Sequence, residues 1–80
     1  MRKEAERLIL QARRDLVNAR KNIGIEAYEV TAFLCHQAVE KYLKGAWIHK
    51  KRARPPATHY LRELGEGLRI PKRLLRHVLF

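Results

Sequence analysis

Four cations lie close together in the second half of the chain, and their chemical type suits the binding of phosphate groups. They are Lys50, Lys51, Arg52 and Arg54. Ammonium and guanidinium groups donate charge-assisted hydrogen bonds to phosphate oxygens, and arginine can donate two such bonds at once. We therefore expect this run to form an anion-binding patch.

A second group of polar residues repeats every four positions. His36, Glu40 and Lys44 fall on one face of any helix that contains them. In a functional interpretation, this strip lines a nucleotide cleft and Lys44 contacts a phosphate. In a structural interpretation, Glu40 and Lys44 form an i,i+4 ion pair that stabilises the helix by about 0.2–0.5 kcal/mol. The sequence is compatible with both.

The charge of the chain is strongly positive and unevenly distributed. Of 80 residues, 18 are Lys or Arg and 8 are Asp or Glu, which gives a net charge of +10. Residues 49–80 hold nine of these bases and only two acids, whereas residues 23–48 hold two bases and three acids. Such a field attracts polyanions and favours RNA, DNA or nucleotide phosphates as ligands. The alternative is an arginine-rich surface that serves solubility or heat tolerance.

A long helix must position these residues, and the stretch 30–51 is typical of one. It lacks proline, is rich in strong helix formers, and repeats its apolar residues at turn spacing. One apolar face comprises Tyr28, Ala32, Cys35, Val39, Tyr42, Leu43 and Ala46, a second comprises Val30, Leu34 and Ile48, and Phe33 and Trp47 lie between. Such a helix is predicted to be central, with neighbours on two or three sides. We expect Cys35 to be buried and Gly45 to face a closely approaching helix.

Shorter patterns predict the helices around it. Residues 3–22 form an amphipathic first helix that Gly24 ends, and the short connection predicts an antiparallel hairpin with the central helix. After two prolines, Thr58 is expected to be the N-cap of a third helix that runs from His59 to about Glu66.

A fourth helix is predicted to open at Pro71. Its apolar pattern still continues at Phe80, which predicts either missing sequence or an end covered by another subunit. The predicted fold class is therefore all-α. It is an up-and-down antiparallel helical bundle with four helices visible and a later helix or helices missing.

Length and composition indicate one domain, residues 1–80, without a cofactor or metal. Cys35 is the only cysteine, so an internal disulfide is excluded, and no His or Cys spacing is typical of metal ligands. The N-terminus is charged, without a signal-peptide pattern, and no apolar stretch is long enough to cross a bilayer. We expect a cytoplasmic protein that makes no membrane contact.

Because so small a core is marginal alone, we also expect a homodimer, in which Phe33 and Trp47 contact a partner.

Three short segments follow one another at a characteristic spacing. They are Ala12-x-x-Asp15-Leu16-x-x-Ala19, Gln37-Ala38-Val39-Glu40-Lys41-x-x-Lys44 and Pro56-x-Thr58-His59-x-Leu61-x-x-Leu64. Together, over residues 5–64, they resemble the HEPN domain family of small helical proteins. The resemblance implies a bundle of four or five helices, commonly a homodimer, that acts on nucleotides or RNA. Many members are encoded beside a small nucleotidyltransferase as a toxin and antitoxin pair, and typical members have another helix or two beyond this end.

The resemblance also raises the question of catalysis. The ribonuclease branch of the family uses an Arg-x(4–6)-His motif, in which histidine moves a proton and arginine holds the phosphate. Arg54 and His59 fit this spacing, but they align with the loop before the third helix, where His59 can instead stabilise the helix start. Arg73 and His77 fall one residue short of the motif.

Three functional hypotheses follow. The first is a HEPN-like nucleotide- or nucleic-acid-binding module, with Lys44, Lys50, Lys51, Arg52 and Arg54 on phosphates. The second is a metal-independent endoribonuclease toxin that uses Arg54 and His59. The third is a non-catalytic, dimerising adaptor for a nucleotidyltransferase subunit.

Overall fold

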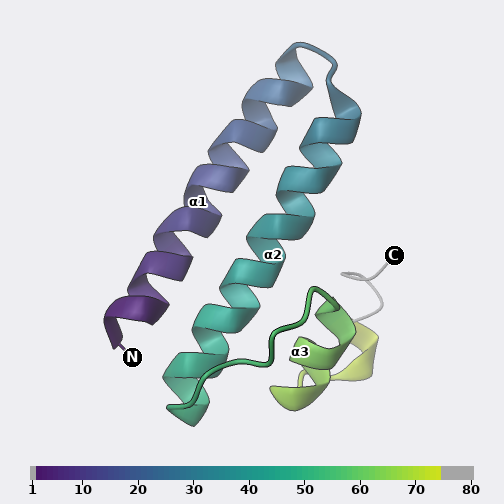
Figure 1. Cartoon of the computed structure of the whole chain (residues 1–80). Coiled ribbons are helices and arrows are strands. Elements are labelled where there is room, and N and C mark those ends of the chain that lie inside the picture. The colour runs from purple at the N-terminus through teal and green to yellow at the C-terminus, as the bar shows by residue number, and fades with distance from the viewer. Residues whose placement is uncertain (1, 75–80) are drawn as a thin grey trace.

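The computed structural model describes residues 2–74 of the chain, and this part contains three helices. Helix α1 spans Arg2–Gly24, α2 spans Tyr28–Lys51 and α3 spans Leu61–Gly67. The two long helices α1 and α2 lie antiparallel, and the short α3 lies beside the C-terminal half of α2 (Figure 1). The predicted all-α, antiparallel architecture is confirmed, and residues 2–74 contain no strand.

Small residues allow α1 and α2 to approach each other closely. Ala12 and Ala38 are fully buried between the helices. At Gly45, an added Cβ would lie 3.2 Å from Cγ1 of Ile9 and 3.4 Å from the carbonyl oxygen of Ala5. A larger residue would therefore push the helices apart. The predicted role of Gly45 at a helix contact is confirmed.

Polar contacts fix the register of this helix pair. The Lys41 ammonium donates to the Asp15 carboxylate over 2.8 Å, and both side chains are largely shielded from solvent. Nearer the hairpin, the Thr31 hydroxyl donates to the carbonyl oxygen of Ala19 over 3.1 Å. Because each link joins atoms with a defined position on its own helix, sliding one helix along the other would break both.

The hairpin turn is formed by the backbone. Helix α1 ends at Gly24, as predicted, and Glu26 takes the left-handed conformation with φ of 61°. The amide of Ala27 donates to the carbonyl oxygen of Asn22 over 2.8 Å, which caps the last turn of α1. The next residue, Tyr28, begins α2.

Helix α3 closes over one end of α2. Leu61, Leu64 and Leu68 are buried, and Leu64 has no exposed surface. The ring of Trp47 lies directly against Gly67, where even a Cβ would overlap it. Trp47 therefore finds its contact within the same chain.

The third helix begins later than predicted. It starts at Leu61 with Tyr60 at the N-cap, and no side chain caps it. The Thr58 hydroxyl instead accepts a hydrogen bond from the Tyr60 amide over 3.1 Å. A threonine that bonds an amide two residues ahead stabilises a turn, which competes with helix at this point.

The predicted burial of Cys35 is wrong. Cys35 is exposed, as are Ala32 and Ala46 on the same face. The buried residues of α2 are Ala38, Gly45 and Ile48, on the sides that meet α1 and α3. Cys35 stays exposed because two neighbouring helices cannot enclose α2 completely.

The beginning of the predicted fourth helix is present. Residues 72–74 are helical after Pro71, and the remaining residues of the predicted helix, including His77, lie outside the described residues. Within the described residues, no helix has the length and apolar character that a membrane span requires.

Candidate functional site

The basic run predicted from the sequence lies where α2 ends. Lys50 and Lys51 occupy the last turn of α2, and Arg52 is its C-cap residue. Cations at this position interact favourably with the carbonyl end of the helix dipole. Arg54 follows in the loop and is exposed. The fold therefore presents all four side chains at one end of the molecule.

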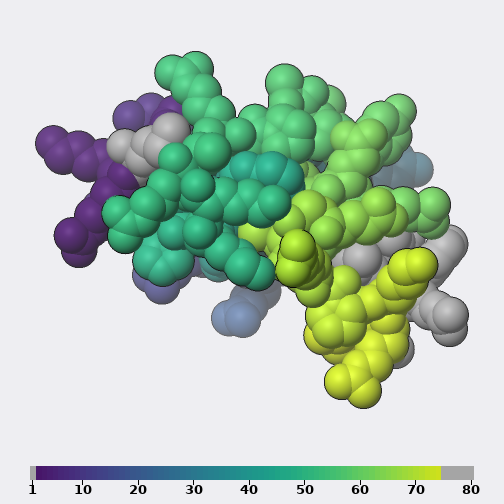
Figure 2. Space-filling model, turned by 90° about the horizontal axis from the view of Figure 1, so that it is seen from below, coloured from purple at the N-terminus to yellow at the C-terminus, as the bar shows by residue number. Residues whose placement is uncertain are grey.

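Lys50 joins this run to a second basic segment. Its ammonium donates to the carbonyl oxygen of Leu68 over 3.0 Å. The chain after Leu68 carries three more exposed cations: Arg69, Lys72 and Arg73. Figure 2 shows the end of α2 and the following loop in green, between the first turn of α1 in purple and the residues near 70 in yellow-green. We call the surface formed by residues 50–54 and 69–73 the basic end.

Lys51 is held over an aromatic ring. Its ammonium lies 4.2 Å from the centre of the Trp47 ring, the geometry of a cation–π contact. The ring itself is fixed by Gly67 of α3. This contact limits the freedom of the Lys51 side chain, so less entropy is lost when it meets an anion.

Two arginines of the basic end adopt strained backbone conformations. Arg52 has φ of 50° and Arg69 has φ of 60°, in the left-handed region that glycine prefers. At Arg52, the amide still caps the helix by donating to the carbonyl oxygen of Ile48 over 2.8 Å. Glycine would make the same bond without strain. Arginine at a position suited to glycine is consistent with a role for its side chain.

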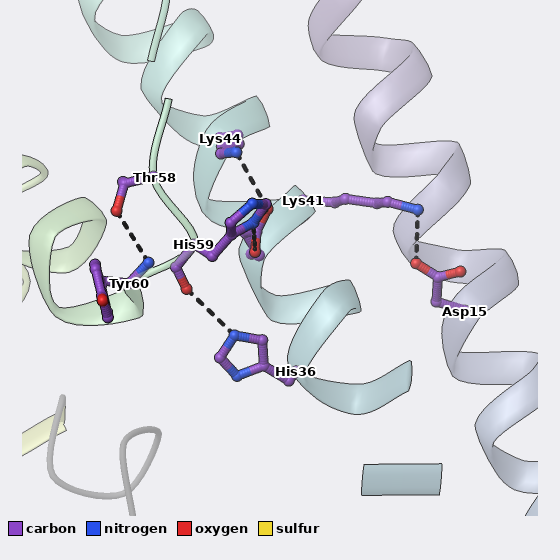
Figure 3. Close-up of polar contacts among 8 residues, drawn as sticks. Asp15, His36, Lys41, Lys44, Thr58, His59 and Tyr60 are labelled. Atoms are coloured by element: carbon purple, nitrogen blue, oxygen red, sulfur yellow. Dashed lines mark hydrogen bonds and ion pairs between the residues drawn. The ribbon is translucent and has the colours of Figure 1, made fainter. Parts of the chain in front are cut away.

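The polar strip of α2 lies beneath the loop that carries His59. The Glu40 carboxylate accepts hydrogen bonds from Lys44 over 3.1 Å and from Nδ1 of His59 over 3.0 Å (Figure 3). On the same face, Nε2 of His36 lies 3.3 Å from the carbonyl oxygen of His59. We call these four residues the Glu40 cluster. It fixes the loop to α2.

The pKa of Glu40 reflects two opposing effects. Burial acts to raise the pKa of this carboxyl, but hydrogen bonds and charge from His59 and Lys44 outweigh burial. The net result is a pKa below the ordinary value. Glu40 therefore stays ionised near neutral pH and holds its partners.

The structure separates the predicted site residues into two groups. Lys50, Lys51, Arg52 and Arg54 share the basic end, whereas Lys44 is paired with Glu40 two turns earlier on α2. The side chain of Lys44 is 18% exposed, as expected from the structural interpretation of the strip.

The candidate catalytic residues Arg54 and His59 both lie in the loop between α2 and α3. His59 bonds to Glu40, while Arg54 extends from the exposed loop. The sequence analysis did not anticipate the Glu40–His59 pair or the hydrogen bond between Lys50 and Leu68. The spacing of residues along the chain gives no signal for either contact.

The fold and this surface define a class of protein: a small helical bundle with a strongly basic end. A family model described as HEPN domain matches residues 5–77, and the chain belongs to this family. Comparisons with curated proteins and with solved structures find no match.

Proposed function

We propose that this HEPN-family protein binds nucleotide or RNA phosphates through its basic end. The observation that carries the proposal is the hydrogen bond from Lys50 to the carbonyl oxygen of Leu68. It holds two basic segments, distant in sequence, on one surface. Residues 50–54 and 69–73 together contribute seven cations and no acid. A polyanion is the ligand that such a surface attracts most strongly.

The proposal predicts a strong dependence of affinity on salt. Each neutralised RNA phosphate should steepen the fall of log K with log salt by about 0.7, the value for single strands. Binding should depend little on base sequence, because phosphate contacts carry no sequence information directly.

The test compares two triple variants of equal charge. Replacing Lys51, Arg52 and Arg54 with Ala should flatten the salt dependence of binding to a fluorescent single-stranded RNA. Replacing Arg7, Arg14 and Lys21 with Ala is the matched control, because these exposed cations lie on α1 at seven-residue intervals. If the two variants lose equal amounts of RNA affinity and of salt dependence, net charge rather than the basic end is responsible for binding.

A second candidate function is metal-independent cleavage of RNA, favoured by the Glu40–His59 pair. The Glu40 carboxylate accepts a hydrogen bond from Nδ1 of His59, which leaves Nε2 as the ring nitrogen that can exchange a proton with a substrate. The His59 side chain is 88% exposed and accessible to a substrate. Arg54 would contact the phosphate. Incubation of the protein with tRNA and mRNA in the presence of EDTA tests this, and His59→Ala should abolish any cleavage.

We also propose that the protein is a cytoplasmic homodimer, and that a nucleotidyltransferase subunit is a candidate partner. Members of this family often dimerise. Phe33 and Tyr28 support the proposal, because these large side chains on α2 are 67% and 63% exposed. A symmetric pair can cover such residues by placing the same patch of two chains together.

A further inference from the structure

A hollow lies between the first turns of α1 and the last turns of α2. Its volume is about 890 Å³, within the range of small-molecule sites. Apolar groups from both helices line it, including Ala5, Ile9, Ala46 and Ile48. The half-buried ring of Tyr42 also lines the hollow. We call this hollow the α1–α2 groove.

Two arginines and a histidine contribute to the lining of the groove. Arg2, His49 and Arg52 line it together with one acid, Glu6. The Glu6 carboxylate is already 3.5 Å from the Arg2 guanidinium, so the acid is partly neutralised. The Arg52 guanidinium remains for an anion, and a ring nitrogen of His49 can donate a hydrogen bond to it. The groove therefore combines an apolar surface with positive charge.

This combination fits a nucleotide better than an apolar or a purely ionic ligand. A nucleobase has a flat, largely apolar face that packs well against aromatic and aliphatic side chains. The phosphate is attached to the sugar of the same nucleotide, so the cation that binds it must lie close to the site of the base. An apolar ligand would leave Arg52 without a role, and inorganic phosphate would leave Tyr42 and Ala46 without one.

We propose that the α1–α2 groove holds one nucleotide, with its base against Tyr42 and Ala46 and its phosphate on Arg52. The inference rests on the proposed function, because Arg52 belongs to both the groove and the basic end. A bound nucleotide thus lies where the phosphate-binding surface begins. The nucleotide can be a free nucleoside phosphate or one unit of an RNA strand.

The first experiment compares three probes on the full chain: ATP, tripolyphosphate and a ten-residue single-stranded RNA. ATP and tripolyphosphate share the phosphate chain, so the difference between their affinities measures the contribution of the nucleoside. We expect ATP to bind about tenfold more tightly than tripolyphosphate, because contacts to one base contribute a difference of this size. Equal affinities for ATP and tripolyphosphate, with RNA binding unaffected by filling the groove, would overturn the inference.

Filling the groove gives the matched variants. Ala46→Trp places a bulky ring in the groove from an exposed helix position, and Ala32→Trp places the same ring on exposed α2 surface outside it. We expect Ala46→Trp to weaken ATP binding about tenfold and to leave tripolyphosphate binding unchanged. Ala32→Trp should change neither. Equal effects of the two variants on ATP would contradict a base site in the groove.

The same variants distinguish the two sources of the nucleotide. If Ala46→Trp weakens ATP binding alone, the ligand is a free nucleotide; if it also weakens RNA binding, the groove takes one unit of the strand. In the second case the salt dependence should stay as in the parent, because the phosphate contacts remain. Failure of the proposed function is separate, since it appears as an unchanged salt slope in the Lys51, Arg52 and Arg54 triple variant.

An NMR titration of the parent chain makes the test independent of variant folding. Addition of ATP should shift the amide signals of Ala5, Ile9, Tyr42 and Ala46 more than those of Ala32 and the hairpin turn. Shifts confined to residues 50–54 and 69–73 would overturn the inference and leave the basic end as the whole binding surface.

Discussion

Asp15 and Lys41, 26 residues apart in the sequence, form an ion pair over 2.8 Å in the interface between α1 and α2. Both belong to the segments through which the sequence resembles its family. Ala12 and Ala38, from the same two segments, are fully buried. Leu64, from the third segment, has no exposed surface. These residues of the three segments therefore build the bundle.

We predict that the Asp15–Lys41 pair contributes measurably to stability. Asp15→Ala should lower the free energy of unfolding by about 1.5–3 kcal/mol, because Lys41 would keep a largely shielded charge without its partner. Urea denaturation of Asp15→Ala, Lys41→Met and the double variant measures the coupling energy. Breaking the exposed Arg2–Glu6 pair is the control, which should have almost no effect. If the losses of unfolding free energy in Asp15→Ala and Lys41→Met simply added up in the double variant, the prediction would be contradicted.

Acid should weaken the Glu40 cluster. The pKa of Glu40 is lowered in the folded protein from its ordinary value of 4.5, so the cluster's contribution is complete above that pH. It is lost as the pH falls through the folded value. Urea denaturation from neutral pH downward should therefore show a smaller acid-induced loss of stability for Glu40→Gln than for the parent. Parallel pH profiles for the two proteins would exclude this role for Glu40.

Two glycines should respond to alanine in opposite directions. Gly67→Ala should lower the free energy of unfolding by about 1–3 kcal/mol, because the new methyl group overlaps the Trp47 ring. Gly24→Ala meets no atom within 4 Å and should stabilise the protein by about 0.4–1 kcal/mol. Thermal denaturation gives both values. A neutral Gly67→Ala would mean that α3 is easily displaced from Trp47.

Replacing Arg52 should separate stability from binding. Arg52→Gly relieves the left-handed backbone strain and should raise the free energy of unfolding by about 0.5–1 kcal/mol. The same change should weaken binding of single-stranded RNA, because a cation is lost from the basic end. Arg52→Ala is the control, which should lose affinity without gaining stability. Undiminished RNA affinity in both variants would remove Arg52 from the binding surface.

The proposed homodimer can be tested at Phe33. Phe33→Glu places a charge at a position that is 67% exposed, so the fold should tolerate it while a self-association surface would not. Analytical ultracentrifugation across micromolar concentrations should show a dimer for the parent and a monomer for the variant. Leu10→Glu, at an exposed position of α1, is the control. A parent chain that stays monomeric throughout would refute the proposal.

Features that depend on neighbouring residues could be predicted from the sequence. Turn-spaced apolar residues predicted α1 and α2 closely, and Gly45 was correctly expected at a helix contact. These features follow from propensity and periodicity, which act over one or two turns. The resemblance to the family was recognisable for a similar reason, since each of its segments is short and two of them lie on α1 and α2.

Which surfaces meet could not be predicted, because it depends on how the helices pack. Periodicity placed Cys35 on an apolar face but could not show that α1 and α3 pack on other sides of α2. The Glu40–His59 bond depends on the path of the loop between α2 and α3. Likewise, the α1–α2 groove requires Tyr42 and Ile9 to lie opposite each other. Such contacts join residues far apart in the chain, and their positions follow from helix packing that no local pattern encodes.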